Sequence, residues 1–207
     1  ILGMARSLLM MPDLLNFWLC GVKANEFTDA TTTQCYNPRT GSWAKDLIHR
    51  MGIPTSIFGE IVPPGTQVGT LRPAVAGAVG CKPLAVIAPA SHDTGSAVAA
   101  VPASSPDYIY ISSGTWSLVG VEVRQPVINE MTLAYNFTNE GGLGGTIRFL
   151  KNTMGLWLVQ ECRREWARTG PKLSYDELTQ IAAEAPAFGS LVVMGDPRYL
   201  APGNMPN

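Results

Sequence analysis

The residues with the clearest chemical potential are His92 and Asp93, which stand between two short apolar stretches. The first stretch, residues 84–88, is continuously apolar and partly β-branched, which predicts a short strand buried on both faces. The second, residues 97–101, is Ala-rich and favours a helix packed closely on a sheet. Open α/β sheets bind ligands at the carboxyl ends of their strands, so Asp93 is the first candidate for a catalytic carboxylate.

Two other interpretations of this carboxylate stay open. Asp, Ser and Thr are favoured helix N-caps, so Ser91, Asp93 or Thr94 could simply satisfy the first backbone N–H groups of the following helix. The run from Asp93 to Ser96 also spells the D-T-G-S of aspartic proteases, whose paired carboxylates share a proton. The sequence holds no second D-T-G, so a protease of this kind would have to be a homodimer.

A second candidate is the small turn Ser112-Ser113-Gly114-Thr115, which lies between two stretches with strand character. Glycine lets backbone N–H groups come close to an anion, and the flanking hydroxyls add donors, so the turn suits a phosphate. An ordinary hairpin turn has the same composition. The glycine-rich residues 141–145 allow the same two interpretations, a backbone facing phosphate or a flexible connection.

Composition excludes several classes of function. The 207 residues suffice for one large or two small domains. A net charge of −1 without a cluster of Lys and Arg argues against a nucleic-acid surface. The most apolar N-terminal stretch, residues 8–22, is interrupted by proline, aspartate and asparagine, so we expect no membrane span. Four scattered cysteines without C-x-x-C indicate reduced, mostly buried thiols and a cytoplasmic location.

Apolar spacing and turn residues predict the elements that must position these side chains. Helices are expected over residues 4–20, 43–51, 152–168 and 174–184, and strands over residues 108–111, 117–123, 133–137, 146–150 and 190–194. Pro12 predicts a kink or two shorter helices in the first of these. His49 is expected to be a surface or packing histidine, and residues 102–106 form the best domain boundary.

Four polar segments follow one another in a specific order. They are Ser91-His92-Asp93-Thr94, Ile111-Ser112-Ser113-Gly114-Thr115-Trp116-Ser117, Asn139-Glu140-Gly141-Gly142 and Leu150-Lys151-Asn152-Thr153-Met154-Gly155-Leu156-Trp157. This combination resembles the FGGY family of carbohydrate kinases, and within it most closely the rhamnulokinase branch. The upstream Asp29-Ala30-Thr31-Thr32-Thr33-Gln34 and the downstream Asp196-Pro197-Arg198-Tyr199 agree with it, so the likeness covers essentially the whole chain.

The resemblance implies an α/β fold with parts of two RNase H-like (actin-like ATPase) domains flanking a catalytic cleft. Residues 1–103 would be the C-terminal part of the sugar-binding domain, and residues 104–207 the N-terminal part of the nucleotide-binding domain. By the same likeness, Asp93 is the catalytic base that takes the proton from the sugar hydroxyl, and it would face Gly114 across the cleft. His92 and Asp93 would contact the sugar, while Ser113, Gly114, Thr115 and Gly141 would bind ATP.

The branch also implies a substrate. It would be a ketose such as L-rhamnulose, phosphorylated on its primary hydroxyl with ATP and Mg²⁺, and other sugars of the family stay open. A non-catalytic descendant that only binds a sugar is the alternative.

The sequence departs from the family pattern in three places. It lacks the family's Asp-x-Gly-Thr phosphate motif and its Gly-rich adenosine motif, and Gly95 stands where relatives often carry another small residue. We therefore expect an internal fragment that binds ATP poorly and is inactive alone. Half-domains expose apolar edges, so we also expect homodimerisation or aggregation.

Overall fold

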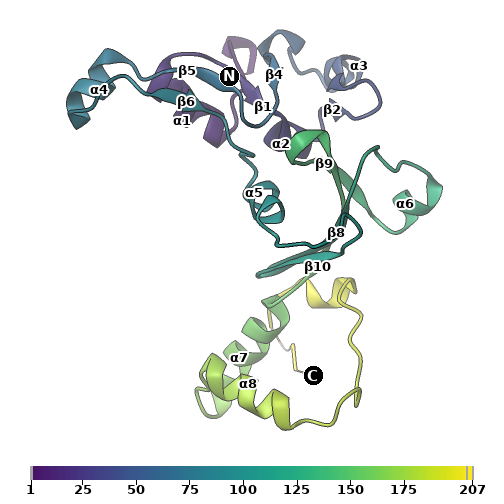
Figure 1. Ribbon diagram of the computed structural model, residues 1–207. Helices are drawn as coiled ribbons and strands as arrows, with labels where there is room; N and C mark the ends of the chain where they lie inside the picture. Colours follow the sequence, from purple (N-terminus) through teal and green to yellow (C-terminus); the bar gives the residue numbers. More distant parts are fainter. Residues whose placement is uncertain (1, 204, 207) are drawn as a thin grey trace. The chain divides into compact units, whose positions relative to one another are not determined.

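The computed structural model describes residues 2–203, 205 and 206. It divides into two compact units: the first holds the residues up to Tyr110 together with Gly120–Leu150, and the second holds Ile111–Val119 and the residues from Lys151 onward. The helices in Figure 1 are α1 (Met11–Cys20), α2 (Phe27–Ala30), α3 (Lys45–Arg50), α4 (Pro73–Val79), α5 (Asp93–Ala99), α6 (Glu130–Ala134), α7 (Trp157–Thr169) and α8 (Tyr175–Glu184).

The strands are short in the first half of the chain and longer in the second. They are β1 (Asn25–Glu26), β2 (Tyr36–Asn37), β3 (Ser42–Trp43), β4 (Ile61–Val62), β5 (Gln67–Thr70), β6 (Ala85–Ile87), β7 (Tyr110–Ser113), β8 (Trp116–Val123), β9 (Thr138–Gly141) and β10 (Ile147–Met154). Single 3₁₀ turns occur at Leu2–Met4, Thr31–Thr33, Thr55–Ile57, Leu143–Gly145 and Pro197–Tyr199. Strands β1 and β4 pair in parallel, whereas β2 with β3 and β5 with β6 pair antiparallel.

Helix α1 is shorter than the sequence predicts. Pro12 lies in its first turn, where the missing N–H costs nothing, so the proline starts this helix instead of kinking it. Residues 5–10 form no helix and Leu2–Met4 is only a 3₁₀ turn, so neither the kink nor the pair of shorter helices is found. Gly21 ends α1 as expected, with φ at +81° and its N–H donated to the carbonyl of Phe17.

A small apolar core lies in the first unit around Ala30, Trp43 and Ile48. The Trp43 ring meets Phe58 edge-on at 4.9 Å, and its Nε1 donates to the carbonyl of Gly59 at 2.7 Å. Segment 43–51 supplies Trp43 from β3 and Ile48 from α3, while His49 is exposed, as expected.

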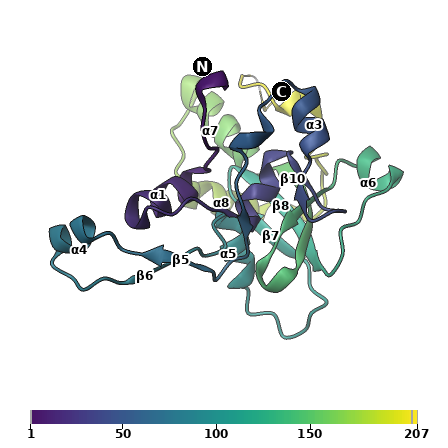
Figure 2. The same cartoon turned by 90° about the horizontal axis from the view of Figure 1, so that it is seen from above.

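Strand β6 corrects the prediction of a strand buried on both faces. Only Val86 is buried, while Ala85 is exposed and Ile87 is 47% exposed. Strand β6 pairs with β5 in a two-stranded ribbon that carries α4 at its end (Figures 1 and 2), so alternate side chains reach solvent. The following helix, α5, begins at Asp93, four residues earlier than the Ala-rich stretch.

The longest sheet has the strand order β7-β8-β10-β9. Strands β9 and β10 are antiparallel, with Ile147 opposite Gly141 and Leu150 opposite Thr138. Gly120 of β8 has no room for a side chain, because a Cβ would lie 2.6 Å from the Leu150 Cβ. Residues 138–141, for which the sequence analysis gave no strand, are an edge strand of this sheet.

Three further predictions of elements are wrong. Residues 133–137 do not form a strand: Asn129 and Thr132 make a capping box that starts α6 at Glu130. Residues 152–154 belong to β10, so the next helix starts only at Trp157. Residues 190–194 have strand propensity but form no strand among the described residues, and propensity alone does not order a segment without a neighbouring strand.

The second unit pairs helices α7 and α8, which Figure 1 draws together. Helix α8 begins as predicted, with Ser174 and Glu177 forming a capping box. Arg163 of α7 donates through Nε to the Leu173 carbonyl at 2.6 Å and covers the Tyr175 ring at 4.7 Å. Among the residues described, we find no helix with the length and apolar character needed to cross a bilayer.

Candidate active site

The start of α5 presents the candidate carboxylate to solvent. His92 is the N-cap residue, but its side chain makes no capping hydrogen bond. Asp93 is the first helical residue; it is exposed, and its carboxylate accepts the N–H of Thr94 at 2.6 Å. The N-cap side chain thus makes no cap, whereas Asp93 satisfies one of the first N–H groups of α5, as the capping interpretation expects. The Asp93 carboxylate remains accessible to a ligand.

The backbone before Asp93 is held by buried side chains that the sequence analysis did not single out. Glu26 is fully buried and accepts the N–H of Ser91 at 3.0 Å. The same carboxylate accepts the N–H and the hydroxyl proton of Thr28. The Thr28 hydroxyl oxygen in turn accepts the N–H of His92 at 3.1 Å. Two consecutive amides that precede the candidate base are therefore tied to the beginning of α2.

Two further carboxylates, those of Asp13 and Asp29, lie near Glu26. Asp13 is buried and accepts the N–H of Glu26 at 3.0 Å and the amide of Asn25 at 3.1 Å. Burial raises the pKa of Asp13 above its ordinary value despite these bonds. Burial, together with the negative charge of Asp13, also raises the pKa of Asp29. Both acids thus favour their protonated forms more than free aspartate does.

Arg148 of β10 connects His92 with Gly141. Its side chain is completely buried, and its Nε donates to the Gly141 carbonyl at 2.9 Å. One terminal nitrogen, Nη2, lies 3.2 Å from His92 Nδ1 and 3.1 Å from Glu140 Oε2. Two of the predicted site residues are brought together in this way, through an arginine that the sequence analysis did not select.

Gly141 itself is committed to the protein interior. Its N–H donates to the Thr31 hydroxyl at 2.8 Å, and its carbonyl accepts from Arg148. A Cβ at this position would lie 2.6 Å from the ring of Phe27. Both backbone polar groups are thus used within the protein, and the close approach of Phe27 is sufficient to require glycine here.

The turn Ser113-Gly114-Thr115 belongs to the second unit and connects β7 to β8, as the sequence predicts. Ser113 and Thr115 are exposed. The carbonyl of Gly114 accepts the N–H of Leu156 at 2.9 Å, and that of Thr115 accepts the N–H of Gly155 at 3.0 Å. The turn is therefore fixed to the start of α7, where the first N–H groups of a helix need acceptors.

One more side chain reaches this turn. Gln160 of α7 donates through Nε2 to the Thr115 hydroxyl at 3.4 Å. Gly155 permits the close approach of the turn, because a Cβ there would lie 2.6 Å from the Gly114 carbonyl oxygen. In the sequence, Gly155 stood out only as part of the segment Leu150–Trp157, one of the four segments that carry the family resemblance.

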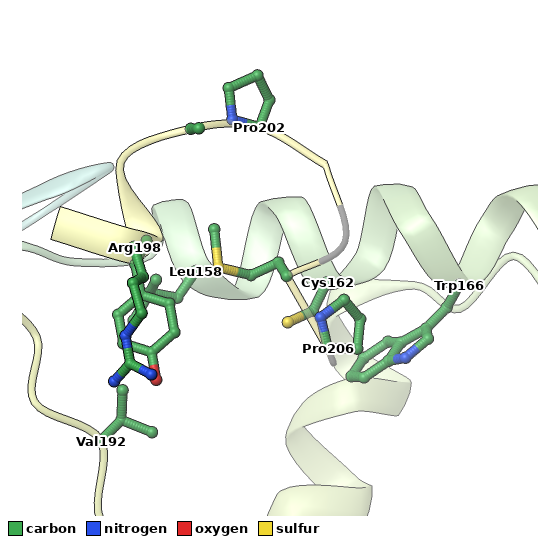
Figure 3. Close-up of a pocket in the computed structure, with 10 residues that line it drawn as sticks. Leu158, Cys162, Trp166, Val192, Arg198, Pro202 and Pro206 are labelled. Carbon is green, nitrogen blue, oxygen red and sulfur yellow. The ribbon is translucent and has the colours of Figure 1, made fainter. Parts of the chain in front are cut away.

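A cavity of about 720 Å³ lies elsewhere in the second unit, between α7 and the C-terminal segment (Figure 3). Leu158, Cys162 and Trp166 line it from the helix. Its charged residue, Arg198, is bound by the Asp196 carboxylate at 2.7 Å. The lining is mostly apolar and offers no general base, so this cavity is not the candidate active site. Across the described part of the chain, no three His, Cys, Asp or Glu side chains gather as potential metal ligands.

Comparison with protein families gives matches over nearly all of the chain. Residues 2–100 match the model for the N-terminal domain of the FGGY family of carbohydrate kinases, and residues 109–207 match the model for its C-terminal domain. A rhamnulokinase of Halalkalibacterium halodurans is 48% identical over 201 residues, which cover 97% of this chain and 42% of the relative. A rhamnulokinase of Bacteroides thetaiotaomicron is 45% identical over 201 residues, with coverages of 97% and 41%. The chain thus spans about two fifths of the length of these relatives.

Solved structures give the fold. A xylulose kinase from Rhodospirillum rubrum superposes with a TM-score of 0.70 at 17% identity, covering 89% of this chain and 38% of that one. The ligand-bound xylulose kinase from Lactobacillus acidophilus gives a TM-score of 0.68 at 17% identity, with coverages of 89% and 37%. These likenesses confirm the predicted α/β class of actin-like ATPase folds.

Proposed function

The chain belongs to the FGGY family of carbohydrate kinases, and we propose that it forms part of an ATP-dependent kinase for a ketose. The reaction is transfer of the γ-phosphate to the primary hydroxyl, with L-rhamnulose giving L-rhamnulose 1-phosphate. The identity of 48% to a rhamnulokinase supports this sugar. The observation that supports this chemistry is the exposed carboxylate of Asp93 at the start of α5. The two preceding backbone N–H groups, of Ser91 and His92, are hydrogen-bonded to Glu26 and Thr28.

Asp93 acts in this proposal as the general base. Phosphoryl transfer needs chiefly positioning and charge stabilisation, and a carboxylate orients the attacking hydroxyl and accepts its proton. The bonds from Glu26 and Thr28 fix the backbone on which Asp93 stands, which reduces the freedom that the base must lose on binding sugar. His92 lies beside it as a ring that contacts the sugar.

The nucleotide is assigned to the turn Ser113-Gly114-Thr115. Its exposed hydroxyls and its glycine suit a phosphate, as the sequence analysis argued. Gly141 is the remaining candidate for binding ATP. Its N–H and carbonyl already have partners within the protein, so it contacts phosphate only if these hydrogen bonds open. Mg²⁺ would arrive with the ATP phosphates, because this metal is usually held by substrate phosphates, water and only one or two carboxylates.

Replacing Asp93 tests the proposed base. In the full-length kinase that contains this chain, Asp93→Asn is expected to lower kcat by about 10²–10⁴-fold, the usual contribution of a general base. Sugar affinity, measured by isothermal titration with a non-hydrolysable ATP analogue present, is expected to change only modestly. The matched control is Asp107→Asn, another exposed aspartate of the first unit, which should keep full turnover.

The outcomes of this experiment separate the candidate functions. Sugar binding without any turnover in the wild-type protein would indicate a non-catalytic sugar-binding protein. Peptide hydrolysis that requires no nucleotide would indicate the aspartic protease. Unchanged kcat in Asp93→Asn would remove Asp93 from the mechanism.

Replacing Gly114 tests the nucleotide turn. The fold tolerates a side chain here, because a Cβ would meet only the Trp116 carbonyl oxygen, at 3.4 Å. If the glycine serves a phosphate, Gly114→Val raises KM for ATP in the full-length kinase about tenfold or more while thermal unfolding stays within a few degrees. An unchanged KM for ATP in a folded variant would assign Gly114 to an ordinary hairpin turn.

Further parts of the proposal concern the whole chain. We place its domain boundary between residues 103 and 104, and we infer that it works in the cytoplasm on small molecules. The 207-residue chain alone is expected to show no useful turnover of L-rhamnulose with ATP and Mg²⁺. Robust turnover would contradict this. Its association state, homodimer included, is measurable by sedimentation.

A further inference from the structure

Arg148 has contacts that give it a role beyond packing. It is 0% exposed, and Nη2 lies 3.2 Å from His92 Nδ1. The same nitrogen lies 3.1 Å from Glu140 Oε2, and Nε donates to the Gly141 carbonyl at 2.9 Å. A buried arginine held by a carboxylate and a carbonyl has little freedom to turn away from the histidine.

The contact with His92 has a definite chemical meaning. A guanidinium group carries only hydrogen-bond donors and keeps its charge in proteins, so it can bond Nδ1 only if Nδ1 has no proton. The ring proton of a neutral histidine then resides on Nε2. An imidazolium ring, or the tautomer with the proton on Nδ1, would instead bring two N–H groups face to face at 3.2 Å.

Another charge near His92 acts in the opposite direction. The Asp29 carboxylate lies close enough to His92 for the two charges to interact, and a carboxylate favours an imidazolium. Burial raises the pKa of Asp29, which weakens this effect. Arg148, in contrast, is in direct contact with Nδ1 and keeps its proton, so the bond that it donates requires a bare Nδ1.

We propose that Arg148 is a positioning residue that holds His92 as the neutral tautomer protonated on Nε2, so that the ring offers an N–H donor to an oxygen of the sugar. Among the described residues, the hydrogen bond of the His92 ring is made by Nδ1, and the half-buried ring leaves Nε2 for a bond to the sugar. The assignment to a sugar rests on the proposed function. Asp93 accepts a hydrogen bond from one sugar hydroxyl, and the Nε2–H of the neighbouring His92 donates to another sugar oxygen.

The tautomer can be measured directly, because the chain contains only two histidines. Two-bond ¹H–¹⁵N spectra of the histidine-labelled chain distinguish a protonated from an unprotonated ring nitrogen. At neutral pH, His92 is expected to show Nε2–H and a bare Nδ1, while the exposed His49 serves as the internal reference. An Nδ1–H tautomer or an imidazolium at His92 in the wild-type chain would overturn the proposal.

The double variant Arg148→Met, Glu140→Gln tests whether the arginine sets the tautomer. It removes both members of the buried pair, which avoids leaving an uncompensated charge. His92 is expected to lose the single tautomer, whereas the control Arg168→Met, at an exposed pair with Glu165, should leave it unchanged. Retention of pure Nε2–H in the folded double variant would overturn the role of Arg148. If that variant does not fold, the wild-type spectrum still decides the tautomer.

Two substitutions of His92 test the donor in the full-length kinase. The amide nitrogen of Gln can take the place of Nε2, whereas that of Asn takes the place of Nδ1. His92→Gln is therefore expected to keep KM for L-rhamnulose at least about tenfold lower than His92→Asn, the equivalent of one hydrogen bond. Equal values would overturn the donor role. If the wild-type kinase binds no sugar while the spectrum shows Nε2–H, the proposed function fails and the tautomer assignment stands.

Discussion

At the scale of single residues, two glycines near the candidate site differ in what their surroundings allow. Gly141 has Phe27 ring carbons 2.6 Å from where a Cβ would be, whereas a Cβ on Gly95 would meet Ala90 and Thr28 at an ordinary 3.5 Å. The structure has room for a small side chain at Gly95, one of the positions where the sequence departs from the family pattern.

We therefore predict opposite effects of the same substitution. Gly141→Ala should lower the free energy of unfolding by about 1–3 kcal/mol through overpacking. Gly95→Ala, inside α5, should raise it by about 0.5–1 kcal/mol by restricting the unfolded chain. Urea denaturation of the two variants measures both values. A neutral Gly141→Ala would show that Phe27 moves aside easily.

At the residue scale, the sequence points to candidate site residues only where the signal is local. His92 and Asp93 stand out because a polar pair follows an apolar stretch. Arg148 and Glu26 gave no such signal: their partners His92 and Ser91 lie 56 and 65 positions away in the chain. Only the fold shows that these charged side chains contact the two residues that precede Asp93.

At the scale of elements, α6 shows how a short polar signal overrides apolar alternation. Leu133 and its neighbours suggested a strand, yet Leu133 is 81% exposed and no strand pairs with this segment. The Asn129 side chain accepts the N–H of Thr132 at 2.9 Å, and the Thr132 hydroxyl accepts the N–H of Asn129 at 3.0 Å. These two bonds decide the local conformation.

Removing this cap should open the helix. Asn129→Ala is expected to cost about 1 kcal/mol, which corresponds to a roughly fivefold faster chymotryptic cleavage after Leu133 or Tyr135. Glu130→Gln, in the same first turn but outside the capping box, is the matched control and should be cleaved at the wild-type rate. Equal cleavage of Asn129→Ala and wild type would mean that α6 does not depend on its cap.

The elements predicted well are those specified by their own residues. Ser174 with Glu177 sets the start of α8, and the alternation over residues 117–123 gives β8. The errors at β6 and at residues 190–194 arose because burial and pairing depend on neighbours that are distant in sequence. A continuous apolar run does not by itself show how many strands cover it.

At the scale of the whole molecule, the buried Tyr110 and the half-buried Tyr108 link stability to alkaline pH. Burial raises the pKa of Tyr110 from 10.0 to about 12. Burial and the hydrogen bond that Tyr108 donates to Glu122 likewise raise the pKa of Tyr108 from 10.0 to about 12. Between these values the unfolded chain has lost phenolic protons that the folded chain still holds, so the unfolded state is favoured as pH rises.

We accordingly predict that stability contributed by these phenols is complete below pH 10 and is lost as pH rises toward about 12. Thermal unfolding followed by circular dichroism over this range should show a falling Tm. The variant with Tyr108→Phe and Tyr110→Phe should show a shallower decline. Absorbance of phenolate in the folded protein should lag behind that of the urea-unfolded chain, and coincident titrations would contradict the prediction.

The hydrogen bond from the Gly141 N–H to Thr31 joins residues 110 positions apart in the sequence. Since the donor is buried and its acceptor sits on a different segment, solvent deuterium can replace this hydrogen only when β9 separates from the turn at Thr31–Thr33. The rate at which the Gly141 N–H takes up deuterium therefore reports how often β9, which Arg148 connects to His92, separates from this turn. A ligand held by that histidine would slow the uptake without touching the glycine.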